Sequence, residues 1–213
     1  MEQQWIEIET TIDTIDWKGD PIQIHKVKAF KDPKTGEIMV YPSEVAKAEI
    51  DQNTGSLGIC PRDAGTLLMI FAKPGNFNEG DVFYKYHLQK MMFLLWKSLD
   101  KIYGDSLPID HFIAAENGPV PENLNNDLQR FEKCNLVRTR CEKWEQGTSK
   151  RIMLTEKGTK VAEALFWKLP DPYKEITLSV KKRIYPKSPD EVRHLIHKEF
   201  PEYKDSYVKN DIE

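Results

Sequence analysis

Amide and cationic side chains gather between residues 121 and 151 at spacings that suit contact with DNA. A helix is expected over residues 121–134, and its positions opposite the apolar stripe carry Asn125, Asn126, Gln129, Arg130 and Lys133. Asn and Gln can pair with adenine through two hydrogen bonds in the major groove, and Arg and Lys can contact phosphates. These residue types therefore predict a reading surface for double-stranded DNA.

A hairpin expected directly after this helix adds further cations. Two short strands are expected over residues 136–142 and 150–155. The basic side chains of this hairpin are Arg138, Arg140, Lys143, Lys150 and Arg151. They could contact phosphates or enter the minor groove, with the tip at residues 143–150 acting as a wing. Trp144 at this tip could pack back on the hairpin, stack on a base or anchor a partner protein.

The elements that must position these side chains follow the order helix, hairpin, helix. Leu124, Leu128 and Phe131 recur at helical spacing and predict the buried face of the first helix. The run Leu154-Thr155-Glu156-Lys157-Gly158 predicts the start of the second, with Thr155 as its N-cap and Gly158 tolerated near its start. This order is typical of the second half of a winged helix. The sequence therefore predicts an α+β fold with a winged helix-turn-helix core.

Three segments are expected along the chain. Residues 1–80 form an N-terminal α/β segment, residues 81–167 the winged-helix domain and residues 168–213 a helical extension. In the first segment, period-2 alternation predicts strands over residues 5–12 and 22–30, the second of which opens a hairpin that ends at residue 41. The remaining helices are expected over residues 43–50, 64–73, 82–103, 108–115, 173–184 and 190–200, the last capped by Ser188.

Composition limits the classes of function. Apolar residues make up 39% and charged residues 31% of the chain, as in soluble globular proteins. We see no run of 18 apolar residues and no signal peptide, and therefore expect a cytoplasmic protein without a membrane contact. The three cysteines match no zinc or redox spacing, and His194 and His197 lack a third metal ligand. With no nucleophile motif either, we expect no enzyme, no metal and no cofactor.

Charge weakens the interpretation as a DNA-binding protein. Residues 120–155 hold 7 basic and 5 acidic side chains, and the net charge of the chain is −3. A DNA-binding domain is often distinctly basic, because neutralised phosphates supply most of the non-specific affinity. The run Lys181-Lys182-Arg183 would extend the basic surface only if it lay beside the hairpin.

Two hypotheses therefore stay open. The first is a DNA-binding transcriptional regulator, for which a homodimer is plausible because operators usually pair two half-sites. The second is a protein-binding antitoxin or adaptor module in which the same fold holds a polypeptide.

Two motifs resemble a known family. The run Leu88-Gln89-Lys90-Met91-Met92-Phe93-Leu94-Leu95 and the turn Asn117-Gly118-Pro119 resemble the Panacea group of SocA-like antitoxin domains and the related YwgA-like proteins. The YwgA-like proteins are also similar in the hairpin and the Leu-Thr-x-x-Gly helix start. The resemblance spans residues 84–165, and the chain departs from the family at Asn117, where Tyr is common. It implies a regulatory or antitoxin-like role, through DNA or a protein partner.

Overall fold

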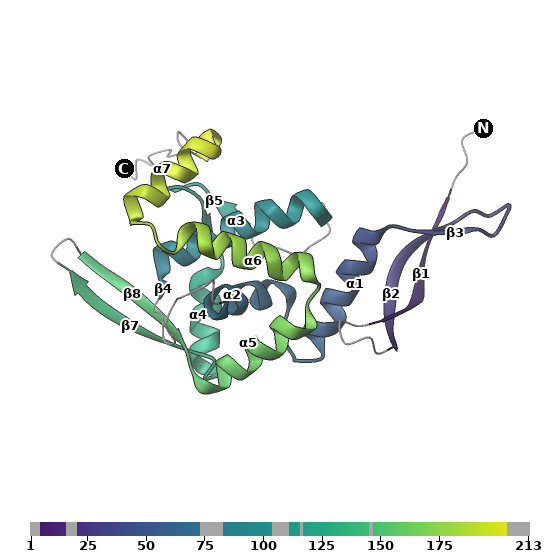
Figure 1. Ribbon diagram of the computed structural model, residues 1–213, viewed down its shortest axis with the longest axis horizontal. Coiled ribbons are helices and arrows are strands. Elements are labelled where there is room, and N and C mark those ends of the chain that lie inside the picture. The colour runs from purple at the N-terminus through teal and green to yellow at the C-terminus, as the bar shows by residue number, and fades with distance from the viewer. Residues whose placement is uncertain are drawn as a thin grey trace, which may run out of the picture.

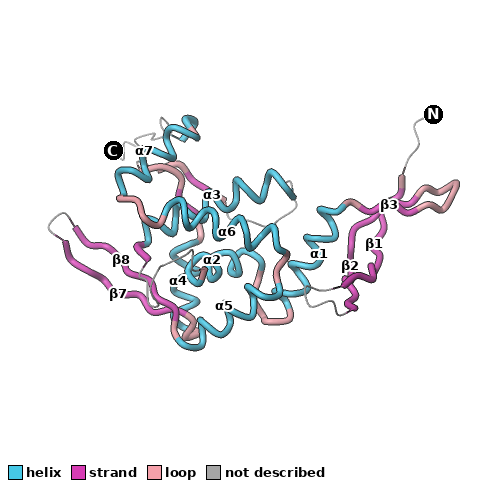
Figure 2. Tube along the Cα trace, in the orientation of Figure 1, coloured by secondary structure: helices cyan, strands magenta, loops and turns pink. Residues whose placement is uncertain are grey.

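The computed structural model of the chain describes residues 5–15, 21–72, 83–103, 111–115, 117–144 and 147–203. These residues confirm the α+β fold, with seven α-helices and three small antiparallel sheets. Figure 1 shows an elongated molecule with the N-terminal sheet at one end, a two-stranded hairpin at the other and helices between them. Figure 2 shows the same division into strand-rich ends and a helical middle.

The N-terminal sheet has the strand order β1-β2-β3. Its strands are β1 (Ile6–Ile15), β2 (Pro21–Lys31) and β3 (Ile38–Val40). The expected hairpin is confirmed as β2 and β3, with Ala29 opposite Val40. Its turn is held by Asp32, whose Oδ1 accepts a hydrogen bond of 2.8 Å from the backbone nitrogen of Lys34. The antiparallel pairing of β1 with β2 was not predicted.

A bulge in β2 changes which side chains this strand buries. The register shifts between Thr10 and Ile12 of β1, where β2 has one extra residue, and Lys26 has a φ of 58°. Ile24 and Val27 consequently face the same side although they are three residues apart, and both are buried. The strict alternation expected over residues 22–30 is therefore wrong beyond Ile24.

Helix α1 (Pro42–Gly55) covers one face of this sheet, and helix α2 (Pro61–Phe71) lies in the middle of the molecule (Figure 1). Ile24 and Val27 form a small core with Ala48 of α1. Leu67 and Leu68 of α2 belong instead to the main core, together with residues of the helices that follow. The division of the chain into three segments stays a prediction.

Three further helices build the main core around α2. They are α3 (Lys85–Tyr103), α5 (Glu156–Lys168) and α6 (Asp171–Ile184). The expectation that the first of them is buried on most sides is confirmed, since Leu88 and residues 91–95 are all buried. Phe93 is central: its ring lies 5.4 Å from that of Phe112 and 4.9 Å from that of Phe200.

The short helix expected over residues 108–115 is wrong where the structure describes it. Phe112–Ile113 form strand β5, which pairs with β6 (Val120–Pro121), and residues 108–110 lie outside the described residues. The turn predicted at Asn117-Gly118-Pro119 joins these strands. Phe112 stacks on Trp96 at 5.1 Å, and this tertiary contact favours the extended conformation.

The C-terminal part ends in α7 (Pro189–Glu199) and the 3-10 helix η2 (Pro201–Tyr203). The predicted cap is confirmed, since Ser188 and Glu191 form a capping box with Pro189 in the first turn. No helix among the described residues has the length and apolar character needed to cross a membrane.

Helix α4 (Leu124–Lys133), strands β7 (Val137–Trp144) and β8 (Gly147–Leu154) and α5 follow each other in the predicted order. Helix α4 begins three residues later than predicted, because Val120 and Pro121 belong to β6. The strands extend into the expected wing at residues 143–150. A two-residue strand, β4 (Phe83–Tyr84), adds to the free side of β8 and gives the order β4-β8-β7.

Candidate functional site

The outer face of α4 carries the predicted amide side chains. Asn125, Asn126 and Gln129 are exposed, as is Lys133, while Leu124, Leu128 and Phe131 are buried. The exposed and the buried face of this helix are therefore the ones that its amphipathic pattern predicted. Its exposed face is polar and available to a partner.

Arg130 belongs to an ion-pair network that the sequence did not reveal. Its Nη2 lies 2.5 Å from Oδ1 of Asp63 in α2 and 2.9 Å from Oδ1 of Asp127. The same oxygen of Asp127 accepts from Nη2 of Arg62 at 2.8 Å. Burial raises the pKa of Asp127, and Asp63 adds to this, while the two arginines lower it. Arg130 therefore ties α4 to α2.

The basic residues of the hairpin divide between its two faces. Arg138 and Arg140 alternate with Thr139, and Arg151 lies directly opposite Arg140 in the register. The hydroxyl of Thr139 donates to Oε1 of Glu132 in α4, so the Thr139 side chain lies on the hairpin face toward α4. Because neighbouring residues of a strand point to opposite faces, the three arginines lie on the face away from the one that α4 contacts.

Lys150 lies on the other face, opposite Cys141. Its charge acts, after burial, to lower the pKa of Lys85 at the start of α3, so the two cations are close. The side chains of Lys143 and Trp144 lie outside the described part of the structure. The amides thus lie on the outer surface of α4, and the three arginines lie on the hairpin face opposite the Thr139 side chain.

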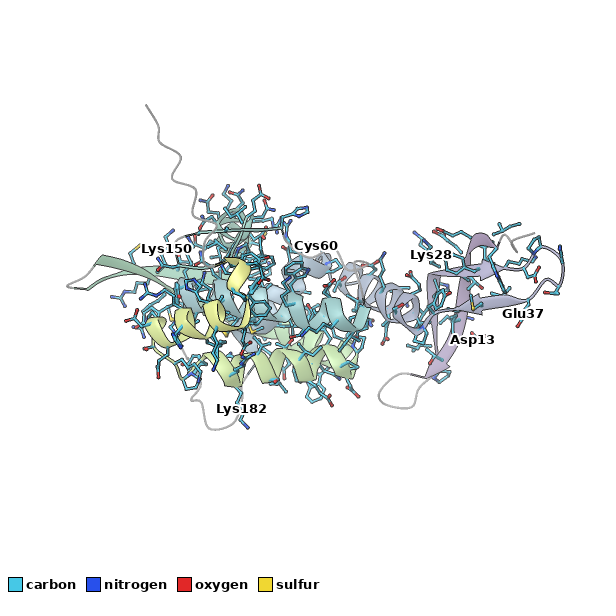
Figure 3. The ribbon with its side chains drawn as sticks, turned by 90° about the horizontal axis from the view of Figure 1, so that it is seen from above. Asp13, Lys28, Glu37, Cys60, Lys150 and Lys182 are labelled. Carbon is cyan, nitrogen blue, oxygen red and sulfur yellow. The ribbon has the colours of Figure 1, made fainter. Side chains whose placement is uncertain are left out.

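The basic run at the end of α6 does not extend the hairpin surface. Nζ of Lys181 is buried and donates to the backbone oxygen of Ile70 at 3.0 Å. Arg183 forms an ion pair with Glu199. Figure 3 shows Lys182 on a different side of the molecule from Lys150. Burial and pairing therefore account for two of the three cations.

The two motifs that carried the family resemblance meet inside the protein. Lys90 of α3 has no exposed surface, and its Nζ donates to the backbone oxygen of Pro119 at 2.8 Å. The ammonium also lies 5.2 Å from the ring centre of Tyr86. Burial lowers the pKa of Lys90 to about 7. Lys90 thus joins helix α3 to the Gly-Pro turn.

Gly118 supplies a left-handed backbone conformation beside this contact. Its φ is +87°, and a Cβ at this position would lie 3.6 Å from both Nζ of Lys90 and Nε2 of His197. Burial raises the pKa of the neighbouring Tyr86 to about 12. The role of Lys90 was not predicted, although a lysine directly before the apolar run at residues 91–95 was the available signal.

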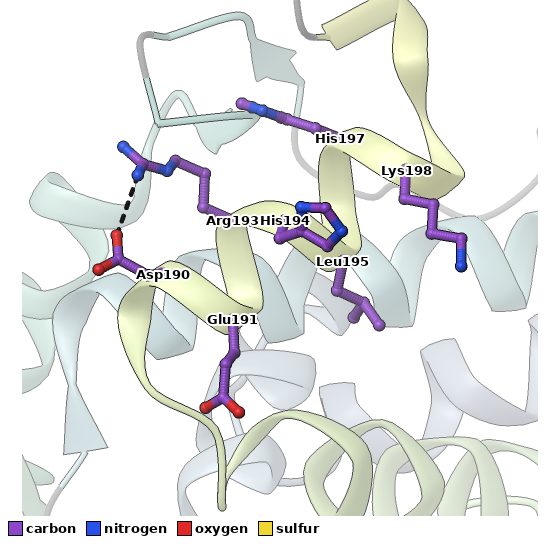
Figure 4. A pocket seen from close by; sticks show the side chains of 7 residues that line it. All are labelled: Asp190, Glu191, Arg193, His194, Leu195, His197 and Lys198. Atoms are coloured by element: carbon purple, nitrogen blue, oxygen red, sulfur yellow. Dashed lines mark hydrogen bonds and ion pairs between the residues drawn. The ribbon is translucent and has the colours of Figure 1, made fainter.

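A hollow of about 880 Å³ lies along α7. Its described lining residues are Asp190, Glu191, Arg193, His194, Leu195, His197 and Lys198. Figure 4 shows Arg193 paired with Asp190, at 3.0 Å, and the two imidazoles pointing in different directions. Among the described residues, no three His, Cys, Asp or Glu side chains come close enough to hold a metal ion.

These contacts define an α+β protein in which a buried lysine joins the central helix to a Gly-Pro turn. Residues 88–201 match the family of SocA-like antitoxins with the Panacea domain, and the chain belongs to this family. The match includes Lys90, Gly118 and Pro119, so the resemblance to the Panacea group is confirmed. No curated protein sequence matches the chain.

Proposed function

We propose that this protein is an antitoxin that binds and neutralises a protein toxin. The observation that carries the proposal is the family match over residues 88–201, which covers more than half of the chain. A member of an antitoxin family is expected to act on a partner whose activity must be restrained. Among the two hypotheses, this favours the protein-binding module.

The placement of the charged side chains also supports a protein partner. Arg130 is engaged by Asp63 and Asp127, and Arg138 and Arg140 lie on the face of β7 opposite the Thr139 side chain that contacts α4. A DNA duplex would need cations beside the reading helix, because phosphate contacts fix its register. The helix-hairpin-helix unit, which we propose to be a winged helix, would then serve as a scaffold for protein contacts.

The direct test is growth rescue. Because a toxin and its antitoxin have to be made together, the protein encoded by the neighbouring gene is expressed as the candidate toxin. We expect it to arrest growth alone and to be harmless when this chain is co-expressed, and the two purified proteins to elute as one complex. Growth arrest that this chain does not relieve would contradict the proposal.

A second candidate function, regulation of transcription through DNA, is favoured by one observation. Asn125, Asn126 and Gln129 are exposed side by side on one helix, and amides of this kind can read adenine. If DNA is bound, a labelled duplex should shift at low salt and be released as salt rises, and Arg138→Glu with Arg140→Glu should abolish the shift. No shift at low salt would exclude this candidate.

A further inference from the structure

Strand β1 forms an open edge of the N-terminal sheet. It is ten residues long and, among the described residues, pairs with β2 alone. Half of the N–H and C=O groups of an antiparallel edge strand point away from its neighbour and are free to bind another strand. Edge strands are usually blocked by Lys, Pro or a bulge. Strand β1 contains neither residue, and the bulge lies in β2.

Among the described residues, the other long edge strand is β7, and a side chain occupies part of its free edge. In β7, Glu132 of α4 accepts a hydrogen bond from the backbone nitrogen of Thr139 and a second one from its hydroxyl. This side chain occupies a donor that an incoming strand would need. The described residues provide no comparable side chain on the free edge of β1. Strand β1 is therefore the better template for strand addition.

The side chains of β1 form two rows with different chemistry. Ile8 and Ile12 lie opposite the buried Ala29 and Ile24, so this row continues the apolar face under α1. Ile6, at the end of the row, is 52% exposed. The other row holds Glu7, Glu9 and Asp13, of which Glu7 is paired with Lys28 of β2 at 2.8 Å and Asp13 accepts a hydrogen bond from Gln23 at 2.9 Å. The strand carries three acidic and no basic side chains.

We propose that the free edge of β1 binds an extended, basic segment of the toxin as a fourth strand. The added strand would place apolar side chains beside the isoleucine row and Lys or Arg beside the acidic row. Opposite charges directly across a strand pair stabilise it, whereas like charges destabilise it. This inference rests on the proposed antitoxin function and assigns its partner-binding strand, which lies outside the residues that match the family.

Charge argues against a second copy of this chain on the same edge. In a two-fold symmetric dimer, two β1 strands would pair antiparallel. Centred on Thr10, that pairing would put Glu7 of one copy opposite Asp13 of the other. Both such pairs would be repulsive, so the edge favours a basic partner.

A designed peptide probes the edge without knowledge of the toxin. The probe is an acetylated peptide of sequence Val-Lys-Val-Thr-Ile-Lys-Val-Lys with an amide end, labelled for fluorescence anisotropy. Paired antiparallel with β1, it places its three lysines opposite Glu7, Glu9 and Asp13. The matched peptide has Glu at each Lys position. We expect the basic peptide to bind roughly tenfold or more tightly than the acidic one, because three attractive cross-strand pairs replace three repulsive ones.

Variants of β1 then locate the site. The double variant Glu9→Lys with Asp13→Lys should lower the affinity for the basic peptide about tenfold and raise the affinity for the acidic peptide. The double variant Glu9→Gln with Asp13→Asn should give affinities between those of this variant and the wild type. The control, Glu163→Lys with Glu175→Lys, makes the same change in charge at exposed positions of α5 and α6. It should leave both affinities unchanged. Circular dichroism confirms that each variant is folded.

Hydrogen exchange gives an independent readout. The bound basic peptide should slow amide exchange in β1 and leave α4 and α7 unchanged. Absence of binding, equal affinity for both peptides, or protection confined to other elements would overturn the inference. So would a dimer in analytical ultracentrifugation that dissociates on changing Glu9 and Asp13.

This outcome is separable from that of the antitoxin proposal. If this chain relieves the neighbouring protein's toxicity equally well with Glu9→Lys and Asp13→Lys, the inference about β1 fails and the antitoxin function stands. If the peptide binds as expected and toxicity is not relieved, the antitoxin proposal fails instead.

Discussion

The two ends of the molecule carry sheets of similar size that differ in their edges. The N-terminal sheet, β1-β2-β3, ends in an acidic strand with a free edge, and the sheet β4-β8-β7 ends in a basic strand that Glu132 closes. Figure 1 shows them at opposite ends of the long axis. The clustering of cations in the hairpin therefore does not mark the sheet edge that is open to another chain.

The two sheets also differ in how they are attached. Ile152 of β8 is fully buried in the main core, and Leu136, directly before β7, contacts Gly158 of α5. The N-terminal sheet instead packs on α1 around its own small core of Ile24, Val27 and Ala48. We therefore expect the hairpin sheet to unfold with the helices and the N-terminal sheet to open more independently.

The largest effect on stability is expected from Gly158→Ala, which disturbs the packing of the hairpin on α5. A Cβ at this position would lie 1.8 Å from the backbone oxygen of Leu136, so backbone must move. We expect the free energy of unfolding to fall by about 3 kcal/mol or more. Thermal unfolding followed by circular dichroism measures it. Gly55→Ala, where a Cβ meets nothing within 4 Å, is the control, and equal effects would contradict the account.

A pair of core truncations compares the two sheets directly. Ile24→Ala and Ile152→Ala remove the same atoms, and the two side chains are 1% and 0% exposed. Each substitution should lower the free energy of unfolding of its surroundings by about 2 to 5 kcal/mol. Hydrogen exchange should speed up in β1, β2 and β3 alone for Ile24→Ala, and throughout α2, α3 and α5 for Ile152→Ala. Faster exchange in α3 for both variants would show that the ends unfold together.

The pH dependence of stability tests the burial of Lys90 in the helical middle of the molecule. Burial lowers its pKa from 10.5 to about 7, so between these values the unfolded chain holds a proton that the folded chain lacks. The contribution of Lys90 to the free energy of unfolding should therefore rise with pH, by at most about 1.4 kcal/mol per pH unit. Lys90→Met should remove that rise in denaturant titrations at several pH values, whereas the exposed Lys160→Met should keep it. An unchanged slope in Lys90→Met would refute the assignment.

The smallest effect on stability is expected from Glu132→Ala. It frees the Thr139 amide and should cost less than about 1 kcal/mol, because the hydrogen bond is exposed. Amide exchange at Thr139 should become faster, and the basic edge of β7 should begin to bind the acidic peptide. If exchange at Thr139 does not change, Glu132 does not close this edge.

Local patterns in the sequence predicted the elements that depend on neighbouring residues. The caps at Thr155 and Ser188, the buried stripe of α4 and the hairpin of β2 and β3 follow from spacing and turn chemistry. Gly158 was expected only to be tolerated, because the sequence does not show that Leu136 presses against it.

Features that depend on distant segments escaped prediction. The bulge at Lys26, the ion pairs of Arg130 with Asp63 and the contact of Lys90 with Pro119 each join parts whose approach only the fold determines. The candidate side chains were therefore placed on the correct helix and hairpin, while their separation onto different faces required the register of β7 and β8. The open edge of β1 was missed for the same reason.

The most direct measurement of the central claim is growth rescue by variants of the two ends. The neighbouring protein is expressed together with the wild type, with Glu9→Lys and Asp13→Lys in β1, or with Arg138→Glu and Arg140→Glu in β7. We predict that the wild type and the β7 variant restore growth, and that the β1 variant does not, although it accumulates to the same level. Rescue by the β1 variant together with failure of the β7 variant would contradict the account.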